Sequence, residues 1–205
     1  MSDQSAEQSP EQLTEPPFTH ESIPGWFNFE DLYMDMVQTH KTGVFVEVGA
    51  WLGKSTAYMA QLLRDNPECM VDFYAVDTWK GSAGDPAFAS ELEKHGGDVY
   101  GAFVENMEKC GVRDFVIPLR ITSVEAAANF GDRSLDFVFI DAAHDYDSFS
   151  ADLRAWLPKV KVGGMIAGHD HSHPPIIKAL KEQIPGAARY KPKNKGDSWF
   201  WVKTA

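Results

Sequence analysis

The sequence has few cysteines, no long apolar run and little positive charge, and each shortage excludes a class of protein. Its two cysteines, Cys69 and Cys110, are too few for a disulfide framework. No segment approaches the ~20 consecutive apolar residues that span a bilayer. The N-terminal region also lacks the basic stretch and apolar core of a secretory signal. We therefore expect a cytoplasmic protein with reduced thiols and no membrane partner.

Basic residues are scarcest at the start of the chain. The net charge is −11 at pH 7, and residues 1–40 contain eight carboxylates without one lysine or arginine, which leaves −3 for the remainder. Nucleic-acid binding depends on basic side chains that neutralise phosphates. The sequence therefore predicts no nucleic-acid partner, and it does not indicate an oligomeric state.

The composition divides the chain into a tail and one domain. Residues 1–24 are rich in serine, glutamine, glutamate and proline and lack an apolar period, which predicts a disordered acidic tail. Residues 25–205 are enough for a single domain with its own core. Apolar and aromatic residues recur at roughly helical spacing from Trp26 to Val37, so we expect a helix at the edge of this domain, beside the pocket.

After Gly43, short apolar runs alternate with longer amphipathic stretches, a pattern typical of β-α units in a mostly parallel sheet. The expected strands are residues 44–48, 71–76, 115–119, 135–140 and 165–167, and the expected helices are residues 55–64, 87–109, 124–129, 148–157 and 175–183. Residues 188–191 and 198–202 flank a turn and predict a C-terminal β-hairpin. The prediction is a doubly wound, Rossmann-like α/β fold whose seven-stranded sheet ends in an antiparallel hairpin.

A glycine loop follows the first expected strand, where parallel sheets bind ligands. Gly49 and Gly53 enclose three residues, one fewer than a phosphate-binding P-loop requires, and Trp51 replaces the second glycine of a dinucleotide motif. With both of these motifs excluded, the pattern Glu47-x-Gly49-x-x-x-Gly53 is left as a candidate cofactor loop. The alternative is a tight turn that needs glycine only for its backbone conformation.

Polar residues end the next two strands. Asp77 lies about thirty residues beyond the glycine loop, where an acidic side chain can accept hydrogen bonds from two ribose hydroxyls, or can merely cap a helix. Thr122 and Ser123 follow the third strand, and hydroxyls there either contact a ligand or cap the next helix. Aromatic residues are most often core, but Trp51 and Trp79 also follow strand ends, where stacking on a ligand is the alternative.

Two further segments carry a resemblance to a known family. Asp141-Ala142-Ala143-His144-Asp145-Tyr146 follows the fourth strand, and Gly163-Gly164-Met165-Ile166-Ala167-Gly168-His169-Asp170 contains the fifth. With the glycine loop and Asp77, they resemble the small class I methyltransferases that include macrolide-sugar O-methyltransferases and cephalosporin-hydroxylase-like proteins. The resemblance covers residues 43–185. It implies S-adenosylmethionine as cofactor, with a binding site formed by Glu47, Gly49, Trp51, Gly53, Ser55, Asp77, Thr122, Ser123 and Asp141.

The same resemblance implies a metal and a base. In the sugar O-methyltransferases, the matching carboxylates bind magnesium and the histidine is the proposed base, so Asp141, His169 and Asp170 become metal ligands here and His144 the catalytic base. His169 stands where those enzymes have a carboxylate. Magnesium prefers oxygen ligands, which leaves manganese, another divalent ion or no metal as alternatives. The alternative for His144 is a structural role, in which its ring only forms a hydrogen bond to a neighbouring group.

The expected reaction is methyl transfer to a hydroxyl group of a small acceptor such as a sugar or glycoside. The alternative is an S-adenosylmethionine-binding protein of the same fold without catalytic activity. Residues 80–97 carry several glycines and are expected to form a mobile loop or lid over the site. His171 and His173 receive no role.

Overall fold

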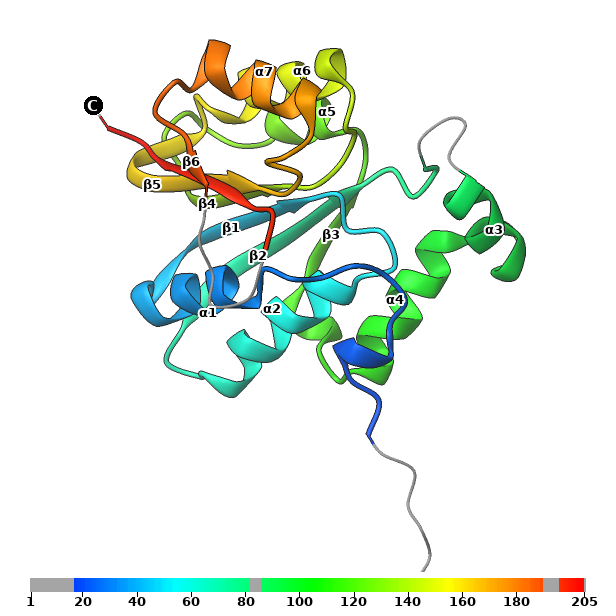
Figure 1. The fold of residues 1–205 in the computed structure, drawn as a ribbon. Coiled ribbons are helices and arrows are strands. Elements are labelled where there is room, and N and C mark those ends of the chain that lie inside the picture. Colours follow the sequence, from blue (N-terminus) through cyan, green and yellow to red (C-terminus); the bar gives the residue numbers. More distant parts are fainter. Residues whose placement is uncertain (1–16, 82–85, 190–195, 205) are drawn as a thin grey trace, which may run out of the picture.

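A computed structural model describes residues 17–81, 86–189 and 196–204, and a seven-stranded sheet forms its centre (Figure 1). The strand order is β3-β2-β1-β4-β5-β7-β6; β1 to β5 are parallel, and β7 runs antiparallel to β5 and β6. This arrangement confirms the expected fold. The strands are β1 (Thr42–Val48), β2 (Met70–Asp77), β3 (Ile117–Arg120), β4 (Leu135–Ile140), β5 (Val160–Gly168), β6 (Ala188–Arg189) and β7 (Trp199–Val202).

Helices cover both faces of the sheet. In Figure 1, α1 and α2 lie on the opposite face from α5, α6 and α7, and α3 projects beyond the edge near β3. The helices are α1 (Glu30–Thr39), α2 (Lys54–Asp65), α3 (Pro86–Lys94), α4 (Val99–Lys109), α5 (Ser123–Ala127), α6 (Tyr146–Trp156) and α7 (Pro174–Gln183), with short 3-10 turns at His20–Ser22 and Arg113–Phe115.

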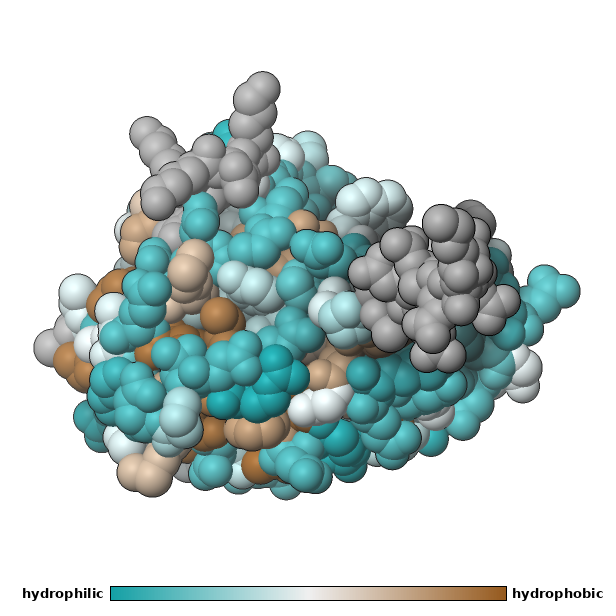
Figure 2. Space-filling view, turned by 90° about the horizontal axis from the view of Figure 1, so that it is seen from below, coloured by the Kyte–Doolittle hydropathy of each residue, from teal (hydrophilic) through white to brown (hydrophobic). Residues whose placement is uncertain are grey.

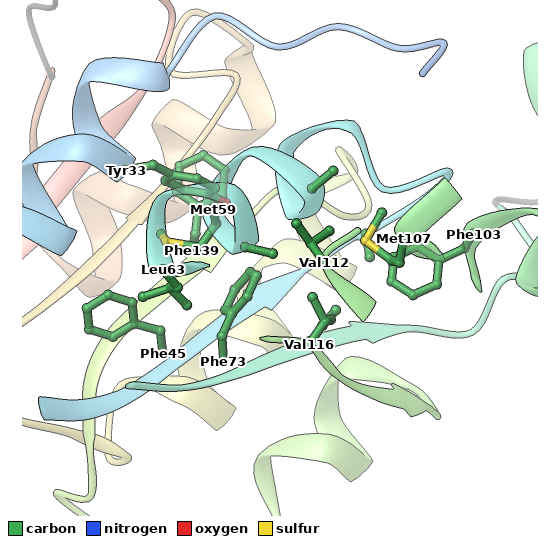
Figure 3. Packing of buried hydrophobic residues seen from close by; sticks show 14 of the residues in the cluster. Tyr33, Phe45, Met59, Leu63, Phe73, Phe103, Met107, Val112, Val116 and Phe139 are labelled. Atoms are coloured by element: carbon green, nitrogen blue, oxygen red, sulfur yellow. The ribbon is translucent and has the colours of Figure 1, made fainter. Parts of the chain in front are cut away.

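Strand residues alternate between two hydrophobic cores because successive side chains point to opposite faces of a sheet. In β1, Phe45 enters the core beneath α1 and α2, whereas Val46 and Val48 enter the core beneath α5, α6 and α7. Figure 3 shows the first core, in which Phe45, Phe73 and aromatic or aliphatic neighbours from the helices interdigitate. Both faces are buried, which explains why the strands are continuous apolar runs.

Two expected elements differ from the structure. Residues 87–109 form two helices, because Gly96 and Gly97 both have positive φ (59° and 90°) and Asp98 then caps α4 by accepting a hydrogen bond from the Gly101 amide (2.9 Å). Half of the expected lid is therefore helical in α3, and its residues 82–85 lie outside the described chain. The strand expected from residue 115 begins only at residue 117, because a 3-10 turn precedes it.

The start of the domain also differs from the prediction. Ile23 is 1% exposed and Phe18 packs against the same core, while the His20 ring bonds to the Gln61 side chain (2.8 Å). The tail predicted over residues 1–24 is thus too long, because two isolated apolar residues anchor its last part without any helical period; residues 1–16 lie outside the described chain. Trp26 precedes α1 instead of belonging to it.

The described surface is mostly polar on the side of α1 and α2. Figure 2 shows that face, where hydrophilic side chains surround smaller hydrophobic patches. Across the described ranges, the search for a helix of sufficient length and hydropathy to cross a membrane finds none.

Candidate active site

The carboxyl ends of the parallel strands open into a cleft of about 1490 Å³. Its walls combine the loops after β1, β2, β3, β4 and β5 with the start of α2, part of α6 and the segment before α1. Lining side chains include Gly49, Trp51, Ser55, Asp77, Thr122, Ser123, Asp141, His144, His169 and Asp170. Most residues predicted for the site therefore meet in one cleft, as expected for the switch point of a doubly wound sheet.

The two glycines of the first loop serve different purposes. Gly49 lines the cleft with φ 96°, and a Cβ there would lie 2.0 Å from the Asp141 carbonyl oxygen. Gly53 also has positive φ (90°), but its Cβ would collide with Met107 and Phe103 of α4, and it is not among the cleft-lining residues. Glycine at 53 is thus explained by core packing, contrary to its predicted place in the cofactor site.

Glu47 is a buried support of this loop. It is 1% exposed and does not line the cleft. The Tyr33 hydroxyl donates to its Oε1 (2.8 Å), and the Thr56 hydroxyl donates to its Oε2. Burial raises the pKa of Glu47 to about 7, although these hydrogen bonds favour the charged form. The predicted cofactor residue therefore connects β1 to α1 and α2 beneath the loop.

Asp77 ends β2 and faces the cleft. Its Oδ2 accepts the Trp51 amide (2.9 Å) and its Oδ1 accepts the Trp79 amide (2.7 Å). Burial raises its pKa, and these amide hydrogen bonds oppose the rise. The Thr78 and Ala50 amides act on the carboxylate in the same way, so Asp77 connects the loops after β1 and β2.

The two tryptophans whose amides bind Asp77 have the same unusual backbone conformation, but their side chains lie in different surroundings. Both have φ 52°, rare for non-glycine residues. Trp51 lines the cleft and its carbonyl accepts the Trp79 indole N–H (2.7 Å). Trp79 is 3% exposed and packs against Tyr100 and Phe103, so core packing is the alternative that holds for it. The turn after β2 therefore directs the Trp79 ring into the core.

Thr122 and Ser123 line the far end of the cleft while taking part in local structure. Thr122 caps α5 in a reciprocal capping box with Glu125. The Ser123 hydroxyl accepts a hydrogen bond from the Trp156 indole (2.9 Å). The helix-capping alternative therefore holds for Thr122, and its hydroxyl is already engaged.

A histidine and two carboxylates meet at the ends of β4 and β5. His144 Nε2 lies 2.9 Å from Asp170 Oδ2 and 3.9 Å from Asp141 Oδ1. Hydrogen bonds to Asp141 and Asp170 raise the pKa of His144 to about 10. Burial alone would raise the pKa of Asp170, but hydrogen bonds from His144 and His169 hold it well below its usual range. His144 is thus an imidazolium paired with carboxylates in this arrangement.

These three residues have a donor set that suits a divalent cation. One ligand atom from each of Asp141, His144 and Asp170 lies within 4.8 Å of the others, and two carboxylates with an imidazole fit manganese, zinc or a similar ion. His169 is outside this group, contrary to the prediction. Its Nδ1 lies 3.3 Å from Asp170 and its Nε2 bonds to Asn28 (3.0 Å), so both ring nitrogens are occupied.

Several lining residues were missing from the predicted site, and four of them have large or charged side chains that could contact a ligand. Trp26 is 92% exposed at the rim, and Lys54, Glu91 and Asp152 also border the cleft. The helical spacing from Trp26 onward had indicated only an edge helix. Asp152 offered a stronger signal, an acidic residue on the apolar face of a helix, where burial demands a partner.

Comparison with known proteins agrees with this geometry. A family described as a methyltransferase domain matches residues 46–171. An uncharacterized protein of Sinorhizobium fredii, y4gI, is 26% identical over 145 residues, which are 71% of this chain; the chain spans 15% of that curated relative.

Solved structures share the fold at low identity. The O-methyltransferase NovP has a TM-score of 0.64 at 19% identity, with 86% of this chain and 78% of that chain covered. CalS11, a TDP-rhamnose 3'-O-methyltransferase of calicheamicin biosynthesis, has a TM-score of 0.54 at 16% identity, with 83% and 77% covered. Together with the family match, the cleft and the sheet order, they confirm the expected resemblance. The chain belongs to the methyltransferase domain family, and its fold is that of the class I methyltransferases.

Proposed function

We propose that the protein transfers the methyl group of S-adenosylmethionine to a hydroxyl oxygen of a small polyhydroxylated acceptor, such as a sugar or glycoside, with the help of a divalent cation. The observation that carries this proposal is the group of Asp141, His144 and Asp170, which faces the same cleft as the glycine loop. The activities named for NovP and CalS11 support oxygen as the acceptor atom.

The described residues fit the cofactor along one wall of the cleft. We place the amino-acid part of the cofactor against Gly49 and its ribose against Asp77, because both residues line the cleft. Ser55 lies in the first turn of α2, where free amides and the helix dipole favour the cofactor's carboxylate. We assign the remaining end of the cleft, beside Thr122 and Ser123, to adenine.

S-adenosylmethionine supplies an electrophilic methyl group: its carbon–sulfur bond breaks, the electron pair stays on sulfur, and a carbon–oxygen bond forms to the acceptor. Asp141 and Asp170 would hold a divalent cation, which would supply Lewis-acid activation of the acceptor hydroxyl. In this proposal the two carboxylates are the cation's ligands and His144 is the base, which takes the hydroxyl proton at Nε2. With a pKa of about 10, His144 is protonated at pH 7, so this role requires another cation to neutralise its two carboxylate partners. The base and the metal are therefore parts of one proposal.

The acceptor lies toward the rim formed by the segment before α1. Trp26 exposes nearly its whole side chain there, and it lines the same cleft as the histidine and carboxylate cluster. An exposed indole offers an apolar platform to a ligand with one apolar face, such as a pyranose ring. Several carboxylates line the cleft, which disfavours an anionic acceptor.

Binding and turnover test the proposal separately. Isothermal titration calorimetry measures S-adenosylmethionine affinity, and a panel of sugars, glycosides and catechols is then scored by release of S-adenosylhomocysteine. Chelator should abolish turnover without loss of cofactor affinity, and manganese or magnesium should restore it. Asp141→Ala should be inactive, whereas Asp147→Ala, on an exposed position of α6, should match wild type. If cofactor binds and no acceptor is methylated under any metal condition, the non-catalytic alternative replaces this proposal.

A further inference from the structure

Asp152 is a buried carboxyl group for which the proposed methyl transfer has no use. It lies in α6, is 5% exposed, and borders the cleft together with Ser148 and Ala151 of the same helix. The facing wall consists of residues 121–124, after β3. This end of the cleft is distant in the fold from the loop after β5, because the sheet order places β3 at one edge and β5 beyond β4.

The polar environment of Asp152 is incomplete. The Ser123 hydroxyl interacts with the carboxyl group. Because the Trp156 indole N–H can only donate, Ser123 Oγ accepts from it and keeps its own hydrogen for Asp152. Within the described ranges, no ion pair joins Asp152 to a lysine, arginine or histidine. Burial raises its pKa to about 6, and the charge of Asp145 adds to this effect.

A carboxyl group so deeply buried is stabilised by further hydrogen-bond donors, and the open side of Asp152 is the cleft. The walls beside it, Ile121, Val124, Ala142 and Ala143, are apolar and border the same space. Such a place suits a flat aromatic base that presents a donor at one edge. Adenine has apolar faces and one exocyclic amino group that donates hydrogen bonds.

We propose that Asp152 is a specificity-determining residue that accepts a hydrogen bond from the exocyclic amino group of the cofactor's adenine, with Ser123 and Trp156 holding its carboxyl group in place. This inference rests on the methyltransferase function, since it requires an adenosyl cofactor in the cleft. It gives α6 a part in cofactor recognition that neither the glycine loop nor Asp77 supplies.

The test compares two ligands on three proteins by calorimetry. The ligands are S-adenosylhomocysteine and its analogue with hydrogen in place of the 6-amino group. Wild type should bind S-adenosylhomocysteine about 10- to 100-fold more tightly than the analogue, which is the range for a hydrogen bond to a charged group. Asp152→Ala should lower the affinity for S-adenosylhomocysteine nearly to that for the analogue. It should leave the affinity for the analogue almost unchanged. Asp147→Ala, which changes an exposed carboxylate of the same helix, should keep the wild-type preference.

A merely structural role for Asp152 would weaken both ligands equally, and an unchanged preference in Asp152→Ala would overturn the contact. If the alanine variant fails to fold, Asp152→Asn keeps the size of the side chain and should show a reduced preference; an undiminished one overturns the proposal. Equal affinities of wild type for S-adenosylhomocysteine and the analogue would also overturn the proposal. Failure of wild type to bind either ligand would instead overturn the cofactor assignment, and with it this inference.

Discussion

Replacement of Glu47 by glutamine should remove a pH dependence from the stability of the fold. The carboxyl group is fully buried between Tyr33 and Thr56, and glutamine resembles its protonated form in shape and hydrogen-bonding oxygen. Glu47 lies outside the cleft lining, so the change tests the architecture beneath the cofactor loop without removing a lining side chain.

The magnitude follows from the shift of the Glu47 pKa from 4.5 to about 7. Below pH 4.5 the carboxyl group is protonated in both the folded and unfolded states, and its contribution is fully present. Between pH 4.5 and 7 the unfolded chain releases the proton while the folded chain keeps it, so rising pH destabilises the fold. The loss amounts to about 3 kcal/mol and levels off above pH 7.

Urea unfolding of wild type and Glu47→Gln at several pH values from 4.5 to 8 measures this effect. Asp152, with a pKa raised to about 6, and His144, with one raised to about 10, titrate in both proteins, so only the difference between the two stability curves reports on Glu47. The variant should gain about 3 kcal/mol relative to wild type across this range. A difference that does not change with pH would refute the argument and place the Glu47 carboxylate in a hydrated environment.

Four other changes test the site and the domain boundary. Asp77→Ala should weaken S-adenosylmethionine binding by ~2 to 3 kcal/mol in calorimetry, as a lost pair of charge-assisted hydrogen bonds; unchanged affinity would leave Asp77 with a purely structural role. His144→Ala should lower turnover ~100- to 10,000-fold with cofactor affinity retained, and a fully active variant would show that His144 is not the base. Trp26→Ala should raise the acceptor KM while Trp26→Phe largely restores it; equal KM values would contradict stacking. Ile23→Ala should lower the free energy of unfolding by ~2 to 4 kcal/mol in urea, whereas a neutral effect would return residues 17–24 to the tail.

The sequence was most informative where a residue lies at the end of a parallel strand. Topology alone brings such positions to one edge of the sheet, so Gly49, Asp77, Asp141 and Asp170 could be placed in one cleft before any coordinates. The strands themselves were predictable because burial on both faces requires continuous apolar runs.

Side-chain direction within a loop was not predictable in the same way. His144 and His169 both follow strands next to carboxylates, and only the backbone path places the first in the cluster and turns the second toward Asn28. Gly53 illustrates the same difficulty, because its requirement comes from Met107, more than fifty residues away along the chain. Contacts between such distant residues leave no local periodicity.

The segment that precedes the sheet connects both halves of the site. Asn28 bonds to His169 beside the carboxylate cluster, and Tyr33, one turn into α1, bonds to Glu47 beneath the cofactor loop. Phe29, between them, is buried against Phe139 of β4 (ring centroids 4.3 Å apart), which fixes the segment to the centre of the sheet. A shift of this segment would therefore move the supports of the cofactor loop and of the proposed metal site together. Trp26, two residues before Asn28, borders the cleft from the same segment.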